Sequence, residues 1–136
     1  MAHVFETSSI RGLSIPNRFV RSATWEGMAN PDGTCTKKLI DLMIQLAKGG
    51  VGLIISGNTG VSPEGQAGPW HLGIYDDRFI PGLLEMTTAV HRAGGKIIIQ
   101  IAHAGCQSHV ELTGKQPIGP SVLMGEKVAY ALYQFG

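Results

Sequence analysis

The sequence has little of several features that define whole classes of proteins. Only two cysteines, Cys35 and Cys106, occur among 136 residues, so the chain has neither a disulfide framework nor a paired CxxC motif. No apolar run approaches the ~18 residues that a membrane-spanning helix needs. The first residues lack both the basic and the apolar stretch of a secretory signal. We therefore expect a protein of the reducing cytoplasm that does not cross a membrane.

The chain also lacks an excess of charge of either sign. Eleven Lys and Arg residues face ten Asp and Glu residues, which leaves a net charge of +1. No block of basic residues is present to neutralise a phosphate backbone, so we expect no nucleic-acid partner. Hydrophobic residues make up 43% of the chain, enough to form a core. The length suggests one domain or part of a larger one.

Glycine is abundant, with 19 residues, and it separates apolar segments along the chain. Residues 51–56 and 96–102 form two short apolar runs in which polar and apolar residues do not alternate. Runs of this kind are typical of strands that are covered on both faces, as in parallel sheets. Residues 18–23 are a weaker strand candidate. The sequence thus predicts a sheet with parallel strands.

Two helical patterns lie between these runs. Thr36 is a candidate N-cap for the first helix and Gly49-Gly50 ends it, while Gly94-Gly95 ends the second. Asp76 or Asp77 can cap the second helix, and Pro81 fits its first turn. The strand–helix–strand–helix–strand order favours an α/β fold, preceded by an extra hairpin or lid that starts near Phe5 and contains Gly12. The stripes that we expect to be buried are Leu39, Leu42, Met43, Leu46 and Ala47, then Phe79, Leu83, Met86 and Val90.

The positions of the glycines distinguish between α/β families. The doublets end helices, and no G-x-G-x-x-G follows a strand, so a dinucleotide site of the doubly wound type is disfavoured. A loop of roughly 20 residues follows the second strand, and long loops are usually functional. In a (β/α)₈ barrel the loops at the carboxyl ends of the strands build the active site. The residues expected at those ends are Ser22, Ala23, Thr24, Trp25, Glu26, Gly57, Asn58 and Gln100.

Four segments resemble consecutive signatures of the Old Yellow Enzyme family. They are Asn-Arg-Phe-Val at 17–20, Gly-Val-Gly-Leu-Ile-Ile at 50–55, Leu-Gly-Ile-Tyr at 72–75 and Ile-Gln-Ile-Ala-His-Ala-Gly at 99–105. The resemblance covers roughly residues 5–125, in the right order. It implies a (β/α)₈ (TIM) barrel that binds FMN, takes a hydride from NAD(P)H and reduces activated C=C bonds.

The resemblance also implies roles for individual residues. The backbone of residues 22–24 would pass beside the flavin ring. Trp25 stands where many relatives have a Thr or Cys that hydrogen-bonds flavin O4, and Thr24 is the alternative residue for that bond. Asn58 occupies a position near the flavin edge that is often Ala or Gly, and Gln100 matches a glutamine that bonds the pyrimidine end of the ring. The implied cofactor-binding residues are Ser22, Ala23, Thr24, Trp25, Asn58 and Gln100.

Several other residues allow two interpretations each, one functional and one structural. Cys106 stands where relatives often carry Arg, and it is either a thiol near the flavin or a small buried hydrophobe. His103 is either a ligand-facing acid or a structural histidine. Trp70 and His71 either contact substrate or pack the long loop.

The length implies a partial barrel. A complete (β/α)₈ barrel takes ~250 residues, so this chain accommodates the first three βα units and the N-terminal hairpin. No catalytic histidine pair follows His103, and we expect residues 1–136 to be the N-terminal part of a barrel, with an atypical apolar tail at about 126–136. We interpret the tail as a sign of a truncated reading frame, a frameshifted reading frame or a deliberate fragment.

Three functions remain open from the sequence. The first is the ring-binding half of an FMN-dependent NAD(P)H oxidoreductase that acts on a small enone-type substrate. Because the loops that hold the FMN phosphate are absent, we expect the isolated chain to bind FMN weakly or not at all and to be inactive. The second is a catalytically silent fragment that only oligomerises, because the apolar strand at 97–101 has an open edge that invites pairing into a homo-oligomer. The third, an unrelated phosphate-binding barrel, is disfavoured by Gln100 and by the position of Lys96 at the start of its strand.

Overall fold

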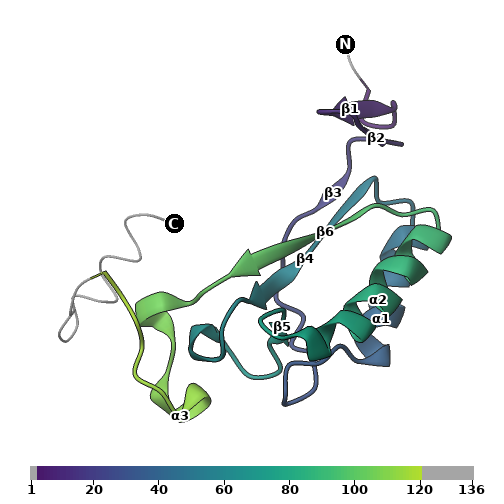
Figure 1. Cartoon of the computed structure of the whole chain (residues 1–136). Helices are drawn as coiled ribbons and strands as arrows, with labels where there is room; N and C mark the ends of the chain where they lie inside the picture. The colour runs from purple at the N-terminus through teal and green to yellow at the C-terminus, as the bar shows by residue number, and fades with distance from the viewer. Residues whose placement is uncertain (1–2, 121–136) are drawn as a thin grey trace.

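A parallel sheet with two helices on one side forms the body of the molecule, and a small hairpin stands at one end of it (Figure 1). The structure is a computed structural model, and it describes residues 3–120. The predicted α/β class, with parallel strands and an N-terminal hairpin, is confirmed. The tail that we expected at 126–136 lies outside the described residues. Within residues 3–120 no helix is long and apolar enough to span a membrane.

The central strand of the sheet is β4, Leu53–Gly60, and all of its partners run parallel to it. On one edge it pairs with β6, Ile97–Ala102, along most of its length. The other edge is shared by β3, Val20–Arg21, at the start of β4 and by β5, Leu72–Gly73, at its end. Parallel strands place their carboxyl ends at one edge of the sheet, so the segments that follow β3, β4 and β6 lie at the same end.

A β-bulge interrupts the pairing of β4 with β6. Ile55 pairs with Ile98 and Asn58 pairs with Gln100, so three steps along β4 correspond to two along β6. The extra residue shifts the alternation of side chains along β4. Ile54 lies before the bulge and Thr59 lies after it, and both face the helices. Their partners on β6, Ile97 and Ile101, are an even number of residues apart and so lie on the same face of that strand.

Helices α1, Lys37–Lys48, and α2, Ile80–Arg92, lie side by side on one face of the sheet (Figure 1). Thr36 caps α1 as predicted, because its Oγ1 accepts a hydrogen bond from the backbone N–H of Leu39. Asp76 caps the 3-10 turn η2, Asp77–Phe79, which leads into α2, so the predicted acidic cap acts one turn earlier than expected. The core between helices and sheet contains Ala29, Leu39, Ile40, Met43, Ala47, Ile54, Leu72, Phe79, Leu83, Met86 and Val90.

The N-terminal hairpin consists of β1, Ser8–Ile10, and β2, Leu13–Ile15. Its two-residue turn is formed by Arg11 and Gly12, whose φ angles are 43° and 89°. Two positive φ angles are typical of the type I′ turn, whose twist matches that of the strands. The hairpin stands apart from the sheet at the end opposite the carboxyl ends of the strands (Figure 1).

The segment that we predicted as one long loop after the second strand is partly regular. Strand β4 continues to Gly60, so Asn58 lies inside the strand and not after it. The loop that follows contains the 3-10 turn η1, Pro63–Gly65, and then β5. The expected strand at 18–23 is shorter than predicted and is confined to the two residues of β3. Beyond β6 lie the 3-10 turn η3, Gly105–Gln107, and the short helix α3, Val110–Thr113.

Candidate functional site

Asn58 and Gln100 lie side by side at the carboxyl end of the sheet. They are register partners across the β4–β6 ladder, so their side chains project from the same face. Gln100 is exposed and Asn58 is half-buried. Among residues 3–120 the buried Oδ1 atom of Asn58 has no hydrogen-bond partner. Two carboxamides with unused hydrogen-bonding capacity therefore meet on the face opposite the helices.

Ser56 holds β6 to β4 at the bulge. Its buried hydroxyl accepts a hydrogen bond from the backbone N–H of Gln100, at 3.2 Å, and donates one to the carbonyl of Gly57, at 2.8 Å. The hydroxyl thus replaces a ladder bond that the extra residue removes. This contact fixes the position of Gln100 along the strand direction relative to Asn58.

A nearly buried ion pair connects the segment after β3 to β4. The Arg21 guanidinium lies 2.8 Å from the Glu26 carboxylate, and the two side chains are 17% and 10% exposed. Arg21 also donates to the carbonyls of Ile55, at 2.8 Å, and Thr24, at 3.0 Å. Glu26 accepts a hydrogen bond from the backbone N–H of Gly57, at 3.0 Å. The ion pair therefore bonds backbone groups of Ile55 and Gly57 on β4 and of Thr24 in the segment after β3.

Gly57 has no room for a side chain. A Cβ atom at this position would collide with the Glu26 carboxylate and would lie 2.7 Å from the carbonyl oxygen of Thr24. Glycine is thus required here by the close approach of the ion pair, and not by a positive φ angle.

The segment that follows β3 contains the four consecutive residues implied as flavin contacts. Ser22, Thr24 and Trp25 are exposed, and Ala23 is half-buried. The Thr24 hydroxyl donates to the carbonyl of Ser22, at 3.2 Å. The Trp25 ring packs against the backbone of Gly27 and of Gly68, where an added Cβ would lie 3.3 and 3.2 Å from the indole.

His71 packs the loop that follows β4. It is 2% exposed, and its Nδ1 accepts a hydrogen bond from the backbone N–H of Ala67, at 3.3 Å. Burial lowers the pKa of His71, and the backbone of Asn58 acts on this pKa in the opposite direction. Among residues 3–120 the Nε2 atom of His71 has no hydrogen-bond partner. Since Nδ1 accepts, the proton of the neutral ring is on Nε2. His71 therefore fits the packing interpretation, whereas its neighbour Trp70 is 53% exposed with a φ angle of 53°.

His103 and Cys106 lie in the segment that follows β6. The Nδ1 atom of His103 accepts a hydrogen bond from the backbone N–H of Gly105, at 2.9 Å, and its ring lies against Gly65. The carbonyl of Gly65 also accepts a hydrogen bond from Ala104. These contacts join the loops after β4 and β6 and favour the structural interpretation of His103. Cys106 is half-buried.

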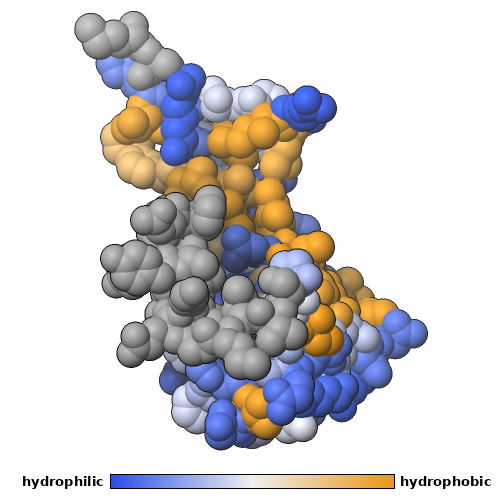
Figure 2. Space-filling model, turned by 90° about the vertical axis from the view of Figure 1, so that its left-hand side faces the viewer, coloured by the Kyte–Doolittle hydropathy of each residue, from blue (hydrophilic) through white to orange (hydrophobic). Residues whose placement is uncertain are grey.

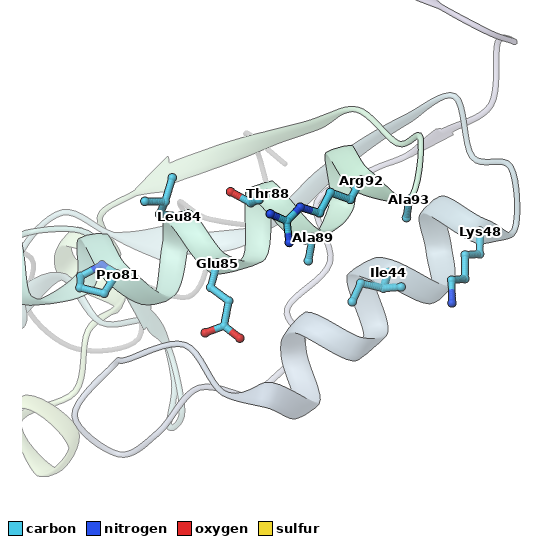
Figure 3. A pocket seen from close by; sticks show the side chains of 9 residues that line it. All are labelled: Ile44, Lys48, Pro81, Leu84, Glu85, Thr88, Ala89, Arg92 and Ala93. Atoms are coloured by element: carbon cyan, nitrogen blue, oxygen red, sulfur yellow. The ribbon is translucent and has the colours of Figure 1, made fainter.

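Two hollows of the surface lie away from these residues. A groove of about 700 Å³ runs between α1 and α2 on the outer side of the molecule, where Glu85 and Ile44 point toward the space between the helices (Figure 3). A second hollow of about 280 Å³ lies beside Trp70 and Lys38. Neither of these two hollows is lined by Asn58, Gln100 or residues 22–25.

The model of the NADH:flavin oxidoreductase / NADH oxidase family matches residues 3–134. The chain belongs to this family. It is 40% identical over 121 residues to an NADH oxidase from Thermoanaerobacter brockii, covering 88% of this chain and 19% of the relative. It is 36% identical over 126 residues to an NADPH dehydrogenase from Halalkalibacterium halodurans, covering 92% of this chain and 36% of the relative.

Solved structures give the same assignment. The old yellow enzyme homologue from Zymomonas mobilis matches with a TM-score of 0.82 and 32% identity over 90% of this chain and 34% of its own. Morphinone reductase in complex with tetrahydroNAD matches with a TM-score of 0.82 and 30% identity over 93% of this chain and 34% of its own. The chain thus spans between about a fifth and somewhat more than a third of the length of these relatives. The resemblance to the Old Yellow Enzyme family and the match to the N-terminal part of its barrels are confirmed.

Of the residues that sequence reasoning selected, the structure makes Asn58 and Gln100 register partners on one face of the sheet. Sequence reasoning placed Glu26 only at a strand end and missed Arg21, Ser56 and the steric role of Gly57. One signal was present: Arg21 is a charged residue that directly follows the apolar Phe19 and Val20 in a predicted strand, and such a residue needs a partner when it is buried.

Proposed function

We propose that this chain supplies the part of an FMN-dependent NAD(P)H oxidoreductase that holds the isoalloxazine ring. The observation that carries the proposal is the pairing of Asn58 with Gln100 at the carboxyl ends of β4 and β6. Membership of a flavin oxidoreductase family supports it. The ring would lie on the face opposite α1 and α2, with residues 22–24 along its side.

The residues present fit such a ring. The pyrimidine end of an isoalloxazine carries both a donor, N3–H, and carbonyl acceptors, and a carboxamide supplies both complementary groups. Gln100 presents its amide to solvent, and Asn58 offers an acceptor that no described residue uses. A buried polar atom without a partner has a free-energy cost that a ligand donor would remove.

The segment after β3 supplies further donors. Among residues 3–120 the backbone N–H groups of Ser22, Ala23 and Thr24 have no hydrogen-bond partner. The Thr24 hydroxyl already donates to Ser22, and the Trp25 ring packs between two glycines. We therefore assign the contact with the ring to the backbone of residues 22–24 and to neither of these two side chains.

When bound, FMN accepts a hydride from NAD(P)H and passes it to an activated alkene, and this chemistry belongs to the cofactor. The chain's own residues orient the ring and set the hydrogen bonds at its edge. Trp25 and Trp70 are about half exposed, at 51% and 53%, in the two neighbouring loops. Such rings suit a planar apolar substrate, so we propose a small enone-type molecule as the acceptor.

The test is an FMN titration of the full chain, followed by flavin fluorescence and absorption. We expect saturable binding, and we expect Gln100→Leu, which keeps the side-chain volume, to weaken it about tenfold, the effect of one lost hydrogen bond. The matched control is Ile101→Thr, which changes an exposed side chain on the other face of the same strand. Absence of binding, or equal affinities for all three proteins, would contradict the proposal.

One observation favours the second candidate function, a catalytically silent chain that associates with itself. Ile98 and Ile101 on β6 are 45% and 67% exposed. Figure 2 looks onto the side away from the helices and shows a band of hydrophobic residues below the hairpin. Apolar strands with an open edge pair readily. Sedimentation at micromolar concentration, with and without FMN, separates the two candidates: a homo-oligomer that does not bind flavin favours the second.

A further inference from the structure

We propose that Arg21, Glu26 and Gly57 form a clamp that frees the backbone of residues 22–24 to contact the flavin ring. In this proposal Arg21 and Glu26 are positioning residues and touch neither cofactor nor substrate. The inference rests on the proposed function, since it assigns the ring contact to this segment. It adds the reason why the segment's donors are available.

The argument begins with the direction of the backbone groups along β4. Leu53 donates its N–H to Phe19, which lies before β3, and Ile54 donates to Lys96, which lies before β6. Successive residues of a strand point their backbone groups to opposite sides. The groups of Ile55 and Gly57 therefore point to the side of β3.

A longer β3 would bond these groups with its own backbone. Instead, Arg21 donates to the Ile55 carbonyl at 2.8 Å, and Glu26 accepts from the Gly57 N–H at 3.0 Å. Two side chains thus complete the rungs that the backbone of residues 22–24 would otherwise form. Strand β3 ends at Arg21, and the following segment leaves the sheet while the Ile55 carbonyl and the Gly57 N–H on β4 stay hydrogen-bonded.

The clamp also fixes where the segment goes. Arg21 donates to the carbonyl of Thr24 at 3.0 Å, which holds the segment close to β4 after it has left the ladder. Gly57 lets this approach occur, because a Cβ would lie 2.7 Å from the same carbonyl oxygen. The N–H groups of Ser22, Ala23 and Thr24 are then left without a partner among residues 3–120.

The pair also sets the charge beside the ring. Together Arg21 and Glu26 are neutral, and their side chains are mostly buried. The change Glu26→Gln keeps an acceptor for the Gly57 N–H but leaves the Arg21 charge unbalanced. A nearby cation favours the anionic reduced flavin over the neutral oxidised one, so this variant should shift the reduction potential of the flavin in the positive direction.

The experiment compares the full chain with Arg21→Met, Glu26→Gln and Gly57→Ala. Circular dichroism and thermal melting first establish which variants fold. We expect at least about tenfold weaker FMN binding for Arg21→Met and Gly57→Ala, and a positive potential shift with a smaller affinity loss for Glu26→Gln. The matched control is Lys37→Met, which removes the exposed pair Lys37–Asp41 and should leave both affinity and potential unchanged.

The outcomes separate the clamp from the proposed function. If the folded variants bind FMN with wild-type affinity and potential, the clamp proposal is wrong while the proposed function stands. If Arg21→Met does not fold, Glu26→Gln decides, since an unshifted potential overturns the charge argument.

If the wild-type chain does not bind FMN, the proposed function fails and hydrogen exchange tests the clamp alone. Glu26→Ala should then speed the exchange of the Gly57 amide by at least about tenfold. An unchanged exchange rate would overturn the clamp.

Discussion

The two faces of the sheet differ in what their side chains contact, although both are built from the same strands. On the face toward α1 and α2, Ile54 is fully buried, and Ile97 and Ile99 pack against the core. On the opposite face Ile98 and Gln100, which alternate with them along β6, are exposed. Under the proposed function, stability and binding depend on alternate positions of one strand, and substitutions on the two faces should have separable effects.

The largest effect on stability should come from the helix side. Met86 on α2 is fully buried in the core, and Met86→Ala should lower the free energy of unfolding by about 3 kcal/mol. Urea unfolding measures this loss, and the control Ile98→Ala on the open face should lose much less. Equal losses for the two variants would show that the open face is covered in solution.

A smaller effect should follow from removal of the α1 cap. The Thr36 hydroxyl accepts from Leu39 and also donates to the carbonyl of Met28, so it joins the helix to the preceding loop. We expect Thr36→Ala to cost about 1 kcal/mol in urea unfolding. Ser14→Ala, on an exposed position of the hairpin, is the control, and a cap variant as stable as this control would contradict the prediction.

The pH dependence of stability should report on His71. Burial lowers the pKa of His71 below its ordinary value of 6.5. The unfolded chain then binds more protons than the folded one, so the contribution of His71 is present above about pH 6.5 and is lost as the pH falls through the lowered pKa. Unfolding curves between pH 7.5 and pH 5 should show this loss. They should show less of it in His71→Gln, whereas an unchanged pH slope in that variant would contradict the assignment.

The smallest effect on stability should come from the open face itself. Ile98 is 45% exposed, and Ile98→Ser should change the free energy of unfolding by no more than about 0.5 kcal/mol. The same substitution should reduce any self-association through this face, because it removes apolar surface. Analytical ultracentrifugation of the variant and the wild type measures the self-association. Urea unfolding of the same two proteins measures the change in the free energy of unfolding.

The helix side of this comparison was largely predictable from the sequence. The stripes at Leu39, Met43, Phe79, Met86 and Val90 identified buried residues because a helix repeats its faces every 3.6 residues, a pattern that needs no knowledge of the rest of the fold. The glycine doublets correctly marked the ends of both helices. These patterns depend only on residues that are close together in the chain, so a single sequence is enough to recognise them.

The residues of the open face were selected as site candidates only through the family resemblance. Gln100 by itself is a polar residue near the end of a strand, and its pairing with Asn58 depends on a bulge that no local pattern announces. The contact between Glu26 and Gly57 joins residues 31 positions apart, and its cause is steric. Interactions of this kind depend on the tertiary structure, so sequence periodicity does not reveal them.

The extra residue in β4 has a consequence for how this strand tolerates mutation. Before Ile55 the inward positions follow one phase, and after Asn58 they follow the other. A deletion of one residue between them would remove the bulge and restore regular pleating, while Asn58, Thr59 and Gly60 would keep their present faces and their register with β6. The carboxamide of Asn58 would stay on the open face beside Gln100, and the loss would fall on Ser56 or Gly57, the two residues that lie between.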